Sequence, residues 1–244
     1  MTATEREDRA WKQRRPRKKR HPLRWLAGLA VVALGGWAWF QWQCWGVSAT
    51  HTDAVLTGLP GGFDGYKIVQ LSDLHGHEYG EGSGDLLAMV ARESPDLIVL
   101  TGDLIDQKGQ LEMIPPLAQG LSAIAPAYYI TGNHEWALKK DTVAALKSLL
   151  AQCGVTPLTN QYEILERDGE RMVLAGVEDP NGYADQTTPQ ELYARIQEEA
   201  PGLFTLLLAH RNDRFEEYAA AGYDFIMSGH GHGGIVRLPF VGGL

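Results

Sequence analysis

Five short runs of apolar residues recur along the chain, and none of them shows a regular alternation of apolar and polar positions. They cover residues 67–71, 96–100, 127–130, 203–208 and 223–227. Apolar runs of this length without alternation are typical of strands that are buried on both faces of a sheet. Two further strand-like runs flank Gly169, at 162–165 and 172–175. The pattern therefore predicts a sheet protein with a substantially buried core.

Helical patterns alternate with these strands. Four residues that commonly cap helices precede amphipathic stretches, and we expect helices to start at Ser83, Asp141, Thr188 and Asp213. The first helix should end before Pro95, and a glycine follows the last. Strands that alternate with helices predict one α/β domain.

Five short polar motifs arrive in order, and four of them directly follow an apolar run. They are Ser72–His75, Thr101–Asp103, Gly132–Glu135, Ala209–Arg211 and Gly229–Gly233. In open α/β sheets, ligands bind beyond the carboxyl ends of the strands. We therefore expect the motifs to converge at one edge of the fold.

The motifs contain seven side chains that can bind metal through oxygen or imidazole nitrogen, namely Asp73, His75, Asp103, Asn133, His210, His230 and His232. Ligands of this mixed type, without cysteine, suit divalent cations. Seven ligands are too many for one ion, but they suit two ions that share a bridging carboxylate. Two ions about 3.5–4 Å apart stabilise the attacking and leaving oxygens of a displacement at phosphorus. The sequence thus predicts a dinuclear phosphoesterase site.

The order of these motifs resembles that of the calcineurin-like metallophosphoesterase superfamily over roughly residues 66–238. The Gly-Val-Glu-Asp-Pro stretch at 176–180, an N-terminal membrane segment and the His-Gly-Gly ending resemble a subgroup of bacterial membrane-associated phosphodiesterases and phosphohydrolases. The resemblance implies a fold of two packed mixed β-sheets flanked by helices, a four-layer sandwich. One departure is that Gly231 stands where the subgroup often has Thr.

The resemblance also implies a role for each motif residue. One ion would be bound by Asp73, His75 and His232. The other would be bound by Asn133, His210 and His230, with Asp103 bridging the two. His134 would donate a hydrogen bond or proton to the leaving-group oxygen, and Asp106 would orient it. By resemblance we rank manganese first for both ions, with iron and zinc as alternatives.

Charge is distributed unevenly along the chain. The net charge is −8, yet residues 1–24 hold 10 Lys or Arg against three acidic residues. The rest holds 12 basic and 27 acidic residues. An acidic domain argues against a nucleic-acid partner, because such binding depends on Lys and Arg contacts to phosphate. The two cysteines exclude a disulfide framework and a Cys-type zinc site.

An uncharged stretch follows the basic residues. We interpret residues 25–47 as a transmembrane helix whose tryptophans lie towards its far end, and 1–24 as a basic cytoplasmic tail. A signal peptide cleaved after Ala49 is the alternative. The positive-inside rule would place the catalytic domain outside the cytoplasm. Residues 48–65 would be a lead-in linker and 66–244 the metallophosphoesterase domain, with C-terminal strands of the family missing after the final Gly-Gly-Leu.

We therefore predict a membrane-anchored, dinuclear phosphohydrolase that uses a metal-bound hydroxide. Its substrate would be a phosphate ester. A catalytic domain outside the cytoplasm could reach lipid phosphates, lipid-linked sugar pyrophosphates or envelope polymers. The choice between phosphodiester, phosphomonoester and pyrophosphate stays open, as does the oligomeric state. Two alternatives are a non-catalytic scaffold or binding module with the same fold and a metal-dependent nuclease. The complete ligand set favours catalysis.

Overall fold

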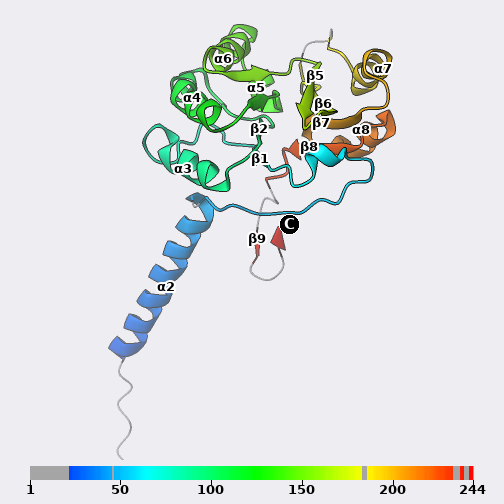
Figure 1. The fold of residues 1–244 in the computed structure, drawn as a ribbon. Coiled ribbons are helices and arrows are strands. Elements are labelled where there is room, and N and C mark those ends of the chain that lie inside the picture. Colours follow the sequence, from blue (N-terminus) through cyan, green and yellow to red (C-terminus); the bar gives the residue numbers. More distant parts are fainter. Residues whose placement is uncertain (1–21, 46, 183–185, 233–236, 239–241, 244) are drawn as a thin grey trace, which may run out of the picture. The chain divides into compact units, whose positions relative to one another are not determined.

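The computed structural model describes residues 22–45, 47–182, 186–232, 237–238 and 242–243 (Figure 1). The chain forms two compact units, residues 1–48 and 49–244. The first contains one described helix, α2 (Pro22–Trp45). All other helices and strands belong to the second unit, which also contains every predicted site residue.

Helix α2 coincides with the predicted transmembrane segment 25–47. Among the described residues, however, no helix is both long enough and apolar enough to cross a membrane. Arg24, Gln41, Gln43 and three glycines lie within α2 and reduce its hydropathy. The structure therefore does not support the predicted transmembrane helix. The basic tail, residues 1–24, lies almost entirely outside the described residues.

The second unit contains two four-stranded sheets. Sheet A has the order β1-β2-β3-β4, and all its strands are parallel. Its strands are β1 (Ile68–Leu71), β2 (Leu97–Leu100), β3 (Ala127–Tyr129) and β4 (Val155–Pro157). Sheet B has the order β5-β6-β7-β8, with β5 antiparallel to β6 and the other pairs parallel. Its strands are β5 (Gln161–Arg167), β6 (Glu170–Val177), β7 (Phe204–Arg211) and β8 (Phe225–Gly229). Only sheet B is therefore mixed among the described strands, whereas we expected two mixed sheets.

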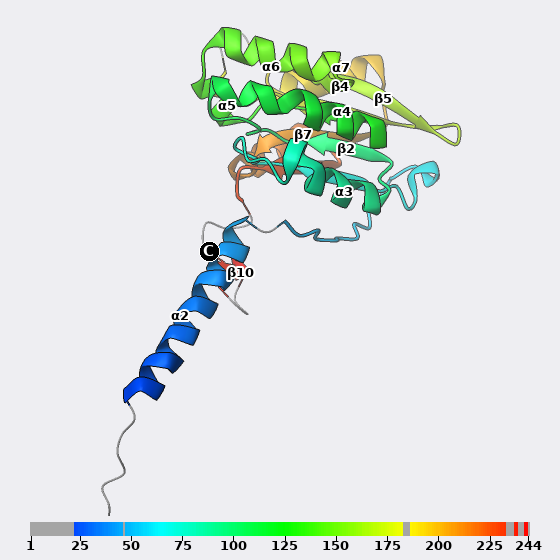
Figure 2. The ribbon, with the colours of Figure 1, turned by 90° about the vertical axis from the view of Figure 1, so that its left-hand side faces the viewer.

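Helices flank the two sheets, as Figures 1 and 2 show. Those that follow strands of sheet A are α3 (Gly84–Glu93), α4 (Ile114–Ile124), α5 (Asn133–Ala137) and α6 (Lys140–Gln152). Those that follow strands of sheet B are α7 (Pro189–Glu199) and α8 (Phe215–Ala221). Four 3₁₀ turns connect these elements: η1 (Gly61–Phe63), η2 (Glu81–Ser83), η3 (Lys108–Met113) and η4 (Asn212–Arg214).

Two buried clusters show how the layers pack. One joins Leu97 and Tyr128 of sheet A to Leu174 and Leu208 of sheet B, so the sheets pack face to face. The other joins the opposite face of sheet B, including Val173, to α7 and α8. This order of helices, sheet, sheet and helices confirms the α/β fold with two packed sheets. Each Å² of apolar surface buried in such layers stabilises the fold by about 25 cal/mol.

Burial of the strands follows their place in each sheet. All residues of β2 and β3 are buried, as their uninterrupted apolar sequences predict. Strands β1 and β8 are only partly buried, because each lies at the edge of its sheet. The prediction of burial on both faces is therefore wrong for these two strands.

The predicted helix starts agree unevenly with the structure. Thr188 caps α7, and its side chain accepts a hydrogen bond from Glu191 N at 3.2 Å. Ser83 precedes α3, but its backbone is left-handed and its hydroxyl caps nothing. Asp141 lies in the first turn of α6 rather than at its cap, which is Lys139. Helix α8 starts at Phe215, two residues after the predicted Asp213.

The C-terminal part contains a short two-stranded antiparallel ladder, β9 (Arg237–Leu238) and β10 (Gly242–Gly243). No strand is expected in the final Gly-Gly-Leu from its composition. Most residues around this ladder lie outside the described part of the chain.

Candidate metal centre

The predicted site residues follow the carboxyl ends of strands in both sheets. Sheet A supplies them from the turns after β1, β2 and β3, namely Asp73, His75, Asp103, Asp106, Asn133 and His134. Sheet B supplies His210 near the end of β7, and His230 and His232 after β8. Strand β7 extends three residues beyond its predicted end at 208, which places His210 inside the strand. The structure brings these nine residues together at one edge of the domain.

One group of ligand atoms comes from Asp73, His75 and His232, and these atoms lie within 4.8 Å of one another. Nδ1 of His75 is 2.8 Å from Asp106 Oδ1, so this nitrogen carries the proton. The lone pair on Nε2 of His75 then faces Nε2 of His232 at 3.2 Å. His232 Nε2 also lies 3.5 Å from Asp73 Oδ1. Three atoms that can bind a metal ion, from Asp73, His75 and His232, therefore lie close together.

A second group comes from Asp103, His210 and His230. Nδ1 of His210 donates to the carbonyl oxygen of Thr101 at 2.7 Å, which leaves Nε2 as the inward-facing nitrogen. This Nε2 lies 3.2 Å from Asp103 Oδ2 and 3.1 Å from Asn133 Oδ1. His210 and Asp103 are both about 1% exposed. A buried arrangement of this kind requires positive charge, from a proton or from a metal ion.

The donor set of both groups fits divalent metal ions. Each group includes one histidine, His75 or His210, whose Nδ1 is held by an oxygen, the usual arrangement of metal-binding histidines. Carboxylate, amide and imidazole donors without thiolate suit manganese, iron or zinc. The residues present therefore fit two ions, although the structure does not distinguish which metal they bind.

His134 lies at the edge of these groups. Its Nδ1 is 2.8 Å from Asp106 Oδ1, and its Nε2 is 4.0 Å from Asp103 Oδ2. The same oxygen of Asp106 contacts Nδ1 of His75. The His134 side chain is 46% exposed, whereas that of Asp103 is 1% exposed. His134 is thus held through Nδ1, and its side chain is about half exposed.

The buried pair Asp103 and His210 shifts the pKa of both members. Burial alone would raise the pKa of Asp103, but hydrogen bonds from His210 and from the His134 backbone N–H outweigh it and lower the pKa. Burial alone would lower the pKa of His210, but Asp103 outweighs it and raises the pKa. The lowered pKa of Asp103 favours its anion, which suits a carboxylate that binds cations.

Five of the seven predicted ligands have a left-handed backbone. Their φ angles are 56° at Asp73, 50° at His75, 54° at Asp103, 68° at His230 and 50° at His232. Among the described residues, only four other non-glycine residues have positive φ. Such conformations cost about 1–3 kcal/mol each and concentrate at functional sites. The strained turns therefore support a functional role for these side chains.

Two glycines allow the close approach that the site requires. A Cβ at Gly132 would lie 2.1 Å from Asp103 Oδ1. A Cβ at Gly229 would lie 1.9 Å from the Ser72 hydroxyl and 2.9 Å from Asp73 Oδ2. No other residue fits at either position without moving a predicted ligand.

Glu135 is a site residue whose role the sequence left undecided. It is fully buried, and its carboxylate accepts backbone N–H bonds from Gly132, Asp103, Leu104 and Ile105 at 2.5–3.3 Å. Glu135 thus joins the turn after β2 to the turn after β3. Burial raises its pKa, and the backbone donors oppose that effect. Its position three residues into a helix start was the only available signal.

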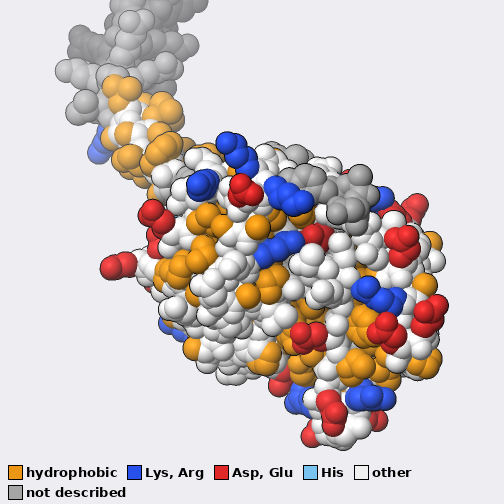
Figure 3. All heavy atoms as spheres, turned by 90° about the horizontal axis from the view of Figure 1, so that it is seen from above, with side chains coloured by type: hydrophobic (Ala, Val, Ile, Leu, Met, Phe, Trp, Pro, Cys, Tyr) orange, Lys and Arg blue, Asp and Glu red, His pale blue; other side chains and the backbone are white. Residues whose placement is uncertain are grey.

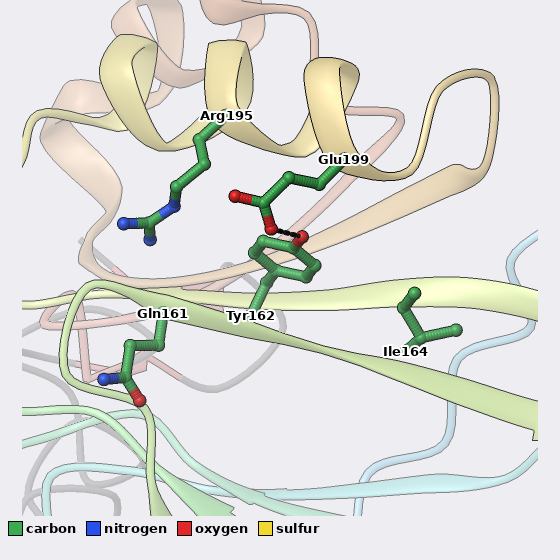
Figure 4. A pocket seen from close by; sticks show the side chains of 5 residues that line it. All are labelled: Gln161, Tyr162, Ile164, Arg195 and Glu199. Carbon is green, nitrogen blue, oxygen red and sulfur yellow. Dashed lines mark hydrogen bonds between the residues drawn. The ribbon is translucent and has the colours of Figure 1, made fainter.

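A surface hollow of about 550 Å³ lies between β5 and α7 (Figure 4). It is lined by Gln161, Tyr162, Ile164, Arg195 and Glu199, and the Tyr162 hydroxyl donates to Glu199. None of the nine predicted site residues lines it. The chemistry predicted from the motifs therefore belongs to the sheet ends and not to this hollow.

Comparisons with known proteins agree with this geometry. The model of the calcineurin-like phosphoesterase family matches residues 66–234. The metallophosphoesterase YkuE of Bacillus subtilis is 32% identical over 225 residues, which cover 89% of this chain and 76% of the relative. Phosphodiesterase YaeI of Escherichia coli is 30% identical over 181 residues, which cover 72% of this chain and 64% of the relative. The chain therefore belongs to the calcineurin-like phosphoesterase family.

Proposed function

We propose that this protein hydrolyses phosphate esters with two divalent metal ions. The observation that carries the proposal is the arrangement of His75 and His210. Each histidine is held through Nδ1 by an oxygen, and each presents Nε2 to other metal-binding atoms. Membership of a metallophosphoesterase family supports metal-dependent hydrolysis of phosphoesters.

Each ion would have its own set of ligands, with one carboxylate shared. Asp73, His75 and His232 would bind the first ion, and Asn133, His210 and His230 the second. Asp103 would bridge them, as the family resemblance implies; it is buried and lies beside His210. The two ions would supply a water of lowered pKa and neutralise charge on the phosphoryl oxygens.

His134 would act on the leaving group. Asp106 holds its Nδ1 at 2.8 Å, so the other nitrogen is free to donate to an oxygen of the substrate. The half-exposed side chain of His134 is accessible to a substrate, whereas that of His210 is buried. Because Asp106 also contacts His75, one carboxylate would fix both a ligand and the acid.

The substrate class is proposed from the relatives and not from a pocket. YaeI is a phosphodiesterase, and we propose a phosphodiester for this chain as well. A nuclease is less consistent with 27 acidic residues after position 24. On the face of the domain drawn in Figure 3, Lys and Arg side chains lie among Asp, Glu and hydrophobic ones.

The location of the domain stays a prediction from charge. Nine basic residues precede α2, and by the positive-inside rule they would remain in the cytoplasm if α2 inserts. A reporter that requires an oxidising compartment, fused after residue 50, should then be active. Activity of a reporter that works only in the cytoplasm would contradict this location and the proposed envelope or lipid-linked substrates.

Hydrolysis assays with each metal test the proposed function. We expect manganese to restore cleavage of a chromogenic phosphodiester by the chelator-treated protein, with less or no cleavage of single-stranded DNA. Preferred cleavage of DNA would favour the nuclease. Absence of hydrolysis from a panel of diesters, monoesters, pyrophosphates and lipid phosphates, despite bound metal, would favour the non-catalytic scaffold.

A further inference from the structure

Three residues at the end of β6 lie next to residues that neighbour predicted metal ligands in the sequence, but they are not predicted ligands themselves. They are Gly176, Glu178 and Asp179, and the two carboxylates are 8% and 1% exposed. Buried carboxylates are costly unless they are paired, so their partners indicate their role.

Glu178 reaches from sheet B to elements of sheet A. Its carboxylate pairs with Lys147 of α6 and accepts a long hydrogen bond of 3.5 Å from the Thr131 hydroxyl. Thr131 also accepts from Trp136 Nε1 at 2.8 Å, and Lys147 lies 5.3 Å from the centre of the Trp136 ring. Thr131 and Trp136 flank Asn133, which lies in the same short stretch. Glu178 therefore connects β6 to the turn that carries Asn133.

Asp179 connects β6 to β7. Its Oδ2 accepts from Arg211 Nε at 2.8 Å, and its Oδ1 accepts from the Asn181 backbone N–H at 2.9 Å. Val177 of β6 pairs with Ala209 of β7. Asp179 lies two residues after Val177, and Arg211 lies two residues after Ala209, so the two side chains come from matching positions. Arg211 is the next residue after His210. Asp179 therefore fixes the end of the strand that carries His210.

Gly176 lets β6 approach sheet A closely. A Cβ at this position would lie 2.5 Å from Leu158 Cβ and 2.7 Å from Ile130 Cγ2. Ile130 precedes Thr131, the residue that Glu178 contacts. The sheets thus approach closely at Ile130, next to the Thr131 residue that Glu178 contacts.

We propose that Glu178 and Asp179 are positioning residues that hold His210 and Asn133 in register across the two sheets. The inference rests on the proposed function, because His210 Nε2 and Asn133 Oδ1, 3.1 Å apart, would bind the same ion. Each carboxylate fixes one side of this pair, Glu178 the turn with Asn133 and Asp179 the strand with His210. Loss of either one should lower the affinity for that ion more than for the other.

The test is equilibrium dialysis of the chelator-treated, full-length protein against Mn²⁺ alone, for wild type, Glu178→Gln and Asp179→Asn. Asp224→Asn is the matched control, because Asp224 accepts from Thr205 N and Oγ1 at 2.7 and 2.8 Å at the opposite end of β7. Arg211→Lys probes the Asp179 contact from its partner if Asp179→Asn does not fold. Thermal unfolding of each metal-free variant reports its stability.

We expect wild type to bind two ions, and Glu178→Gln and Asp179→Asn to bind one of them about 10- to 100-fold more weakly, the usual effect of removing an outer contact of a metal site. Asp224→Asn should lose stability and keep both affinities. Wild-type affinities in both carboxylate variants, with stability lowered as in Asp224→Asn, would overturn the proposal and leave the proposed function intact. A wild type that binds no ion would overturn both.

Discussion

At the residue scale, the site is defined by which nitrogen of each histidine is held. His75 and His134 both contact Asp106 Oδ1 through Nδ1, at 2.8 Å each. His75 nevertheless turns its Nε2 towards the first group of ligand atoms, whereas that of His134 is 4.0 Å from the Asp103 carboxylate. The same contact with one carboxylate is thus compatible with the proposed roles of His75 as a metal ligand and His134 as a proton donor.

His134→Ala should separate these two roles. We expect the variant to retain its metal ions and to lose about 10²–10⁴ in kcat, the range for a general acid. The loss should be smaller for substrates with good leaving groups, which need little protonation. Turnover and metal content of the purified variant measure both effects, and equal losses for good and poor leaving groups would argue against the acid role.

Glu135→Gln should destabilise the fold around the site. The carboxylate accepts four backbone N–H groups, and an amide NH₂ would face at least one of them. A buried donor that loses its acceptor costs about 1–3 kcal/mol. Denaturant unfolding of the metal-free protein measures this, with Glu166→Gln at an exposed position of β5 as control. A variant as stable as the wild type would show that Glu135 does not hold the two turns.

Some residues of the site could be predicted from the sequence, and others could not. The predicted ligands and His134 could be found because they occur in short motifs directly after strands or, for His210, near a strand end. The partners of Glu135 are backbone N–H groups, which carry no sequence signal. The Glu178–Lys147 pair joins residues 31 positions apart in different layers, so only the folded chain reveals it.

At the element scale, the alternation of strands and helices was predictable from the sequence. The burial of the edge strands and the first residues of the helices were harder to predict. The apolar runs located β1, β2, β3, β7 and β8 to within three residues at each end. Their edge positions depend on the order of strands, which the pattern does not encode. Helix α4 begins with Pro115 and Pro116 in its first turn and was not recognised. Its mixture of prolines and apolar residues resembles a loop when only the sequence is read.

The end of β8 should tolerate no side chain at Gly229. A Cβ there would meet Ser72 Oγ and Asp73 Oδ2, so Gly229→Ala should displace Asp73 and weaken binding of the first ion. Gly84→Ala is the control, because nothing lies within 4 Å of a Cβ at Gly84. Calorimetric titration with Mn²⁺ compares the two variants. Unchanged binding in Gly229→Ala would contradict the placement of Asp73.

At the scale of the whole domain, the site lies where two sheets meet. Sheet A provides Asp73, His75, Asp103 and Asn133, and sheet B provides the three remaining predicted ligands. Ions bound by both sheets stabilise the folded state by RT ln(1 + [L]/Kd), about 2.7 kcal/mol at 100 times Kd for one site. A divalent metal should therefore raise the midpoint of thermal unfolding by several degrees. The family and its two sheets were predictable from the motifs, whereas contacts between the sheets depend on packing.

Two ions that share Asp103 are the central claim, and counting the ions bound per chain tests it most directly. Elemental analysis after dialysis with Mn²⁺ should give about two ions for the wild type and one or none for Asp103→Asn, because the variant loses the shared negative charge. Phosphodiester hydrolysis should fall in parallel. Two bound ions and full activity in Asp103→Asn would contradict the claim, as would full activity of a wild type that holds no metal.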